Sequence, residues 1–352
     1  MRKIIFLLIF ISPLLQFYYA FAQTKSTVVK GRVLEYETGK PLENVNVFAS
    51  GTTWGTTSNE SGYFEIKNLP PGNHEIVASM IGYESQTKLV QLKSGMSVEL
   101  EFKLPEAHYE LEAVTVSGAV PTAWQNNYKI FEKRFLGTSQ FADDCIIKNP
   151  EVINFTWTDK HHLTAKAEET LKIINKDLGY EINCVLVAFD WDAEEYHIQT
   201  SVRPSFTELK DSTGAQKKEW LYNRKIAYAG SIDNFLQAVK NNTLQADGFQ
   251  VYQDLGPLSE VPLRRLNHVI GPLVNKNNNQ YSLSFSGYLR VLYVLKDPEN
   301  PEVSWIKLTY PTVTLDSYGY PVEALPFEVY GYWTQLGIAD MLPKYYSPKD
   351  TL

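Results

Sequence analysis

Short β-rich runs separated by turn signals fill residues 27–104 and constrain the fold more than any other feature of the chain. Apolar residues alternate with polar ones in these runs, as at Val45, Val47 and Ala49, which is typical of strands with one buried face. Turns are marked by Thr38-Gly39-Lys40-Pro41 and Leu69-Pro70-Pro71-Gly72, because proline fixes φ and glycine permits a positive φ. About seven strands at this spacing predict an all-β sandwich over residues 24–105 that folds on its own.

Several motifs within this stretch also stand in a recognisable order. They are Gly31-x-Val33, the run from Thr38 to Val47, Gly55-Thr56-Thr57 followed by Gly62, Phe64 and Ile66, Leu69-Pro70-Pro71-Gly72, and Ile81-Gly82-Tyr83. In this order they resemble the carboxypeptidase regulatory-like domain, a seven-stranded sandwich of the transthyretin or immunoglobulin type. The resemblance implies an accessory role and implies no peptidase activity.

The segment Leu111–Gly118 resembles the one that follows such domains in TonB-dependent outer-membrane receptors. Only 234 residues follow Gly118, too few for the plug and barrel of a receptor. We therefore expect a related exported protein that lacks this barrel.

The first 22 residues have the features of a signal peptide. Arg2 and Lys3 precede an apolar run from Ile4 to Leu15, and Ala20-Phe21-Ala22 supplies small residues at a cleavage site. We expect cleavage before Gln23, the alternative being an uncleaved anchor over residues 4–22. The sequence thus predicts export to the periplasm or the outer membrane, with no transmembrane helix left after cleavage.

The length of the chain predicts the number of domains, and its net charge limits the class of partner. The 352 residues predict two domains, and we assign 106–123 to a linker and 124–352 to an α+β domain with a mostly antiparallel sheet. The formal net charge of -7 at pH 7 excludes nucleic acid as the expected partner, because such a partner requires a basic surface.

Two helices are predicted in the second domain from the spacing of apolar residues. One covers 124–135, and the other follows Ser231 as N-cap, with Ile232, Phe235, Leu236 and Val239 on one face. Residues 163–174 fit a helix or two strands, and we favour strands. Four further stretches are rich in β-forming residues, namely 182–189, 281–295, 303–315 and 326–333.

Blocks throughout this second domain resemble an uncharacterised family of exported bacterial proteins that carry the same N-terminal module. They include Asn149-Pro150-Glu151-Val152-Ile153, Leu178-Gly179-Tyr180, Trp220-x-x-Asn223-Arg224 and Gly331-Tyr332-Trp333. The resemblance implies architecture and compartment and names no substrate.

A polar and aromatic cluster between residues 220 and 228 is the candidate ligand site. It consists of Trp220, Asn223, Arg224 and Tyr228, and an arginine beside aromatic faces can grip a carboxylate or phosphate. The competing interpretation, which we favour, is that the buried Arg224 and Asn223 brace the junction to the next helix.

The sequence predicts no metal site, catalytic residue or cofactor. None of the six histidines, His74, His108, His161, His162, His197 and His268, stands in a metallopeptidase motif, and serine-hydrolase and nucleotide-binding signatures are absent. Asp190-Trp191-Asp192-Ala193-Glu194-Glu195 can be read as calcium ligands or, as we favour, as a solvated hairpin turn. Cys145 and Cys184 can form a disulfide in an exported protein or remain buried thiols, and their spacing does not decide between the two.

These observations favour a non-enzymatic envelope protein that binds a glycan, a peptide or an outer-membrane protein. One alternative is a hydrolase of envelope polymers with a carboxylate-based site, which leaves no sequence motif. Another is a small outer-membrane barrel built from residues 281–333. A cleft with paired carboxylates of shifted pKa would favour the hydrolase, and an exposed aromatic surface would favour binding.

Overall fold

The computed structural model describes residues 26–107, 121–195, 197–211, 214–269, 272–277, 280–323 and 325–348. The expected signal peptide, His108, Leu111–Gly118 and most of the expected linker lie outside these residues. Thr122 and Ala123, which we assigned to the linker, belong to the first helix.

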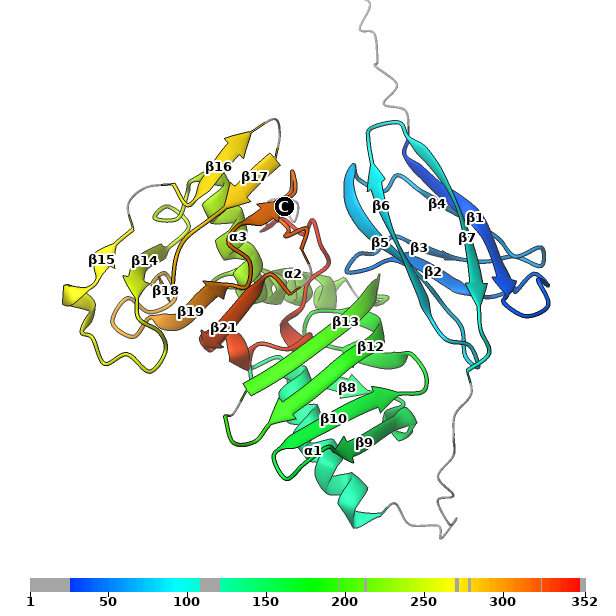
Figure 1. Cartoon of the computed structure of the whole chain (residues 1–352), viewed down its shortest axis with the longest axis horizontal. Coiled ribbons are helices and arrows are strands. Elements are labelled where there is room, and N and C mark those ends of the chain that lie inside the picture. Colours follow the sequence, from blue (N-terminus) through cyan, green and yellow to red (C-terminus); the bar gives the residue numbers. More distant parts are fainter. Residues whose placement is uncertain are drawn as a thin grey trace, which may run out of the picture.

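The N-terminal module is a sandwich of two sheets (Figure 1). Its strands are β1 (Val28–Glu35), β2 (Asn46–Ala49), β3 (Gly55–Thr57), β4 (Tyr63–Lys67), β5 (Gly72–Ser79), β6 (Gln86–Leu92) and β7 (Ser97–Leu104). One sheet has the order β4-β1-β7, with β1 and β7 parallel, and the other has the order β3-β2-β5-β6. Alternate side chains such as Val29 and Val33 are buried between the sheets, which confirms the predicted seven-stranded sandwich.

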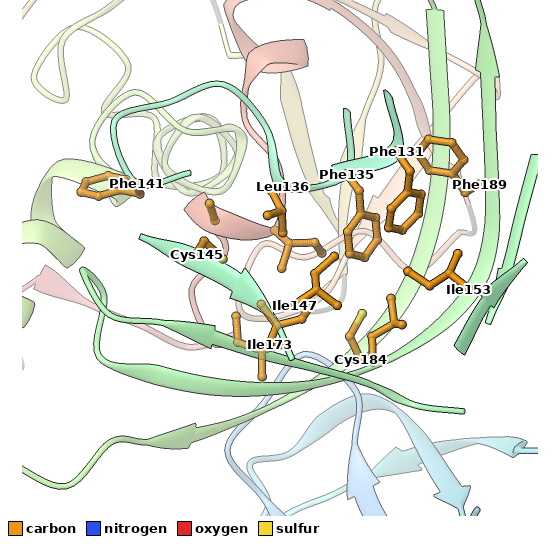
Figure 2. Packing of buried hydrophobic residues seen from close by; sticks show 14 of the residues in the cluster. Phe131, Phe135, Leu136, Phe141, Cys145, Ile147, Ile153, Ile173, Cys184 and Phe189 are labelled. Atoms are coloured by element: carbon orange, nitrogen blue, oxygen red, sulfur yellow. The ribbon is translucent and has the colours of Figure 1, made fainter. Parts of the chain in front are cut away.

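A six-stranded antiparallel sheet wrapped around one helix forms the middle of the chain. Its elements are α1 (Thr122–Leu136), β8 (Cys145–Ile147), η1 (Pro150–Val152), β9 (Ile153–Trp157), β10 (His162–Ala167), β11 (Leu171–Asn175), β12 (Tyr180–Asp192) and β13 (His197–Glu208). Strand β12 pairs along its length with β13, while β11 and β10 pair with its two ends. Figure 2 shows Phe131 and Phe135 pointing from α1 into a buried cluster with Ile153 and Phe189.

The rest of the chain contains two further helices and two antiparallel sheets. The elements are α2 (Ala215–Tyr228), α3 (Ile232–Asn241), β14 (Phe249–Asp254), η2 (Leu263–Arg265), β15 (Asn267–His268), β16 (Val274–Asn277), β17 (Gln280–Leu283), β18 (Tyr288–Tyr293), β19 (Glu302–Leu308), β20 (Val313–Leu315), β21 (Phe327–Gly331), η3 (Tyr332–Gln335) and η4 (Ile338–Asp340). The strand orders are β15-β14-β18-β19-β21 and β16-β17-β20. The antiparallel pairing confirms the predicted α+β class.

Two hydrophobic clusters, rather than one, support the region after the module. The first joins α1 to the middle sheet, and the second gathers Phe235, Leu236 and Val239 of α3 with residues of both later sheets. The assignment of 124–352 to one α+β domain stays a prediction.

The two predicted helices are present as α1 and α3. Ser231 caps α3 as expected, since its side chain accepts a hydrogen bond from the backbone N–H of Asn234 at 3.1 Å. Residues 163–174 form strands β10 and β11, the interpretation we favoured. In the described part of the chain, no helix is both long and apolar enough to span a membrane.

Candidate functional site

The module docks on the middle sheet through the turn between β2 and β3. The backbone N–H of Gly51 donates to the carbonyl of Pro204 at 2.6 Å, and the N–H of Phe206 donates to the carbonyl of Thr52 at 2.9 Å. This short parallel bridge adds the turn to the free edge of β13. Because both partners are backbone groups, the register between the module and β13 is fixed at this point.

A segment near the end of the described chain closes the same junction from the other side. The backbone N–H of Lys344 donates to the carbonyl of Gly51 at 2.6 Å. The ring of Tyr345 lies against Trp54 and His74 of the module, with ring centres 6.0 and 6.1 Å apart. It also packs edge to face on Tyr318, at 4.5 Å between centres. The junction therefore joins three parts of the chain.

A hollow of about 360 Å³ lies beside this junction, and we call it the neutral groove. Trp54 lines it together with hydroxyl and amide side chains, and none of its lining residues is charged. The residues come from β2 and the turn after it, from β3, β5, β12 and β13, and from the turn between β10 and β11: Asn46, Phe48, Thr53, Trp54, Gly55, Thr56, Thr57, Ser79, Thr170, Asn183, Ser205, Phe206 and Thr207. Such a lining offers donors and acceptors without net charge beside an aromatic ring.

A second hollow of about 270 Å³ lies on the other side of one interdomain hydrogen bond, between the hydroxyls of Ser79 and Thr170 at 2.8 Å. We call it the acidic groove, because Glu84, Glu168 and Glu169 line it. Ser79 and Thr170 line both grooves, so this hydroxyl pair separates them.

The carboxyl groups with raised pKa lie outside both grooves. Burial raises the pKa of Asp177, Asp233 and Asp340 above the ordinary value for an aspartate. Asp340 has a structural task, because it accepts the backbone N–H of Gly337 at 3.1 Å. These groups are therefore not placed to act on a molecule held in either groove.

The structure places the predicted cluster on α2, in a bracing arrangement. Trp220 and Arg224 are buried, and the amide of Asn223 donates to the carbonyl of Asp177 at 3.0 Å. Tyr228 packs against Tyr346 at 5.7 Å between ring centres, and burial raises its pKa to about 12. The four residues share one helix, and their contacts run to neighbouring segments of the protein.

Arg224 makes the most contacts in this cluster. Its guanidinium donates to the carbonyl of Leu178 at 2.7 Å, to the carbonyl of Gly179 at 3.3 Å and to the carboxylate of Glu208 at 2.7 Å. It also lies 4.0 Å from the ring centre of Tyr180. These contacts favour the bracing interpretation, and the ligand-binding interpretation stays a prediction.

Carboxylates of the acidic hairpin between β12 and β13 accept hydrogen bonds from within the protein. Asp192 accepts the backbone N–H of Glu194 at 2.8 Å, and the ring of His162 donates to Asp190 at 3.0 Å. Among the described residues, no three histidine, cysteine, aspartate or glutamate side chains converge on a point that could hold a metal ion. The turn between β12 and β13 is the hairpin that we favoured over calcium ligands.

The two cysteines are free thiols in separate parts of the middle sheet (Figure 2). Cys145 pairs with Asn175 of β11, and Cys184 pairs with Leu171 of the same strand. Those partners are four positions apart, which separates the cysteines by about 13 Å along the strands alone. A disulfide requires Cα atoms within about 7 Å of each other, so the pair cannot bridge in this fold.

We expect both thiols to be unreactive in the folded protein. Burial raises the pKa of the Cys145 thiol to about 12 and raises that of Cys184 further, so almost no thiolate is present at neutral pH. Intact mass after iodoacetamide treatment should show no adduct on the native chain and two adducts after denaturation, without any reductant. Adducts that appear only after reduction would demonstrate a disulfide.

Sequence reasoning missed the residues of the neutral groove. Residues 51–62 are rich in glycine, threonine, serine and asparagine, a composition that predicts a hairpin turn and no binding site. A tryptophan within such a polar turn, Trp54, was the available signal, because a large aromatic residue in a turn needs either a packing partner or a ligand.

Comparison with known proteins identifies the module. Residues 29–116 match the family model of the CarboxypepD_reg-like domain, which confirms the resemblance drawn from the sequence motifs. No curated protein matches the chain.

Among solved structures, the similarities are weak. A 3-chlorocatechol 1,2-dioxygenase of Rhodococcus opacus is 12% identical over 24% of this chain and 61% of its own, with a TM-score of 0.19. A streptococcal ancillary pilin is 18% identical over 24% and 33%, with a TM-score of 0.21. A putative carbohydrate binding protein of Bacteroides uniformis is 8% identical over 82% and 98%, with a TM-score of 0.18. This chain spans less than two thirds of the first two proteins, and at these scores none supports an argument about function.

Proposed function

We propose that this chain, which carries a CarboxypepD_reg-like domain at residues 29–116, is an exported envelope protein that binds a neutral glycan in the neutral groove without altering it chemically. The composition of that groove carries the proposal, because Trp54, Phe48 and Phe206 line it together with hydroxyl and amide side chains and with no charged one. A sugar offers matching hydroxyl groups for hydrogen bonds and an apolar C–H face for an aromatic ring.

The charge of the groove argues for this ligand class over others. An anionic polymer or a phosphorylated ligand calls for arginine or lysine at the site, and no such residue lines the groove. Its volume of about 360 Å³ lies near the lower end of the range of small-molecule pockets, about 300–1,000 Å³. It therefore suits a short segment of a glycan.

Trp54→Ala is expected to weaken binding of neutral oligosaccharides at least tenfold, or about 1.4 kcal/mol, because it removes the one indole of the groove. The measurement is calorimetric titration of the full chain with a panel of neutral gluco-, xylo- and manno-oligosaccharides. Uronic-acid oligosaccharides of the same length should bind more weakly than the neutral ones.

Trp157→Ala provides the matched control. Trp157 is a partly exposed indole of β9 that lines neither groove, so this variant should bind as the unaltered chain does. Equal loss in both variants, or binding of acidic sugars only, would contradict the proposal. Release of reducing ends from the bound sugar would support the hydrolase alternative instead.

A further inference from the structure

The loop between β14 and β15 presents two leucines to solvent at the end of the molecule remote from the module (Figure 1). We call residues 255–266 the leucine loop. Leu255 is 80% exposed and Leu258 is 96% exposed. Leu258 is the most exposed large apolar side chain among the described residues. Single exposed leucines are ordinary, whereas two so fully exposed in one short loop require a reason.

The leucine loop is held firmly at its base. Gln253 pairs with Asn267, which closes the loop between β14 and β15. At its start, Asp254 accepts hydrogen bonds from Arg290 at 2.6 Å and from the indole of Trp305 at 2.8 Å, and its side chain is fully buried. A buried ion pair therefore anchors the start of the leucine loop.

Arg290 also restrains the far side of the loop. Its guanidinium donates to the carbonyl of Val261 at 3.3 Å, and the N–H of Ser259 donates to the carbonyl of Gly256 at 3.0 Å. With both sides tied to one arginine, the tip is preorganised in its exposed conformation. Binding through Leu255 and Leu258 would then cost little further ordering of the chain.

The exposed charges of the leucine loop are mostly positive. Arg264 and Arg265 are exposed in η2, against one exposed carboxylate at Glu260. The whole chain, in contrast, carries a formal net charge of -7. A basic pair in the same loop as the exposed leucines thus contrasts with an acidic protein, and it complements an anionic surface.

We propose that the leucine loop inserts into an anionic phospholipid surface, with Leu255 and Leu258 at the depth of the acyl chains and with Arg264 and Arg265 among the headgroups. The two leucines are almost fully exposed, and a bilayer interface accepts apolar side chains accompanied by basic ones. The leucine loop is separate from the neutral groove, so this inference does not depend on the proposed glycan binding.

The test is co-sedimentation of the full chain with vesicles of phosphatidylcholine alone and of phosphatidylcholine mixed with phosphatidylglycerol. We expect binding to the mixed vesicles that falls as salt is raised. The double variant Leu255→Ser and Leu258→Ser should weaken it about a hundredfold. Arg264→Gln with Arg265→Gln should remove the preference for the anionic lipid.

Leu89→Ser serves as the matched control, because Leu89 of β6 in the module is also 79% exposed. This variant should bind vesicles as the unaltered chain does. Because all the altered side chains are exposed, every variant should keep the original unfolding midpoint. Absence of vesicle binding by the unaltered chain, or equal binding by the double leucine variant, would overturn the proposal. Self-association that the double variant abolishes, without any vesicle binding, would identify a second copy of the chain as the occupant.

Discussion

Arg224→Ala is expected to lower the free energy of unfolding by about 3 kcal/mol. The substitution removes the side-chain donor from the carbonyl of Leu178 and one of two donors from the carbonyl of Gly179, and it removes the cation that lies over the ring of Tyr180. Glu208 adds less to the loss, since 43% of its side chain is exposed and water can solvate it. Urea unfolding of the full chain, followed by circular dichroism, measures the effect.

Tyr222→Ala on the same helix is the control for this experiment. Tyr222 is 66% exposed, so its loss should change stability by no more than about 0.5 kcal/mol. If Arg224→Ala instead leaves the midpoint unchanged and abolishes capture of components from the envelope, the cluster of Trp220, Asn223, Arg224 and Tyr228 is a binding site.

Gly31→Ala is expected to lower the stability of the module by at least about 4 kcal/mol. Gly31 lies in β1, the middle strand of its sheet, and a Cβ there would stand 1.7 Å from the carbonyl oxygen of Leu100 in β7. The obstacle is backbone, which cannot rotate away as a side chain can. Strands β1 and β7 would have to separate, which breaks the parallel pairing that closes the module.

Limited proteolysis and urea unfolding of the full chain measure this loss, with new cleavage expected between residues 28 and 104. Gly39→Ala is the matched control, because a Cβ at Gly39 has open space although its φ is +69°. Gly39→Ala should lower the free energy of unfolding only by the strain of a left-handed backbone, about 1–2 kcal/mol. Similar losses at Gly31 and Gly39 would contradict the steric argument.

The module and α3 could be predicted because their local signals agree with their environment. Alternation in β1 and the glycine and proline turns reflect a sheet with one buried face, and Ser231 begins α3 where a side-chain cap is needed. Helix α2 was missed because its buried positions are Trp220, Arg224 and Ala227. They have the spacing of a helix face, but the arginine in the middle hides the apolar pattern that identifies such a face.

The neutral groove could not be predicted, since it depends on contacts between distant segments. Trp54 and Thr56 face Asn183 and Thr207 only because Thr52 is paired with Ser205. Nothing local in either segment specifies that pairing. The cysteines illustrate the same point, because their separation is set by the register of β11 with its two neighbours. Sequence spacing contains no information about this register.

Gly51 makes two backbone hydrogen bonds: its N–H donates to the carbonyl of Pro204, and its carbonyl accepts the N–H of Lys344. These two bonds set the order in which the parts of the chain can assemble during synthesis. The sandwich contains all of its own strand partners by residue 104, so it has what it needs to fold while the remaining chain is still being made. Its register with the middle sheet can be fixed once residue 206 is available, and the bond from Lys344, which closes a much longer loop, comes after it. The residues that line the neutral groove all lie at or before Thr207, so the groove requires the module and the middle sheet, and a chain that ends before β13 would carry a finished module without a finished site.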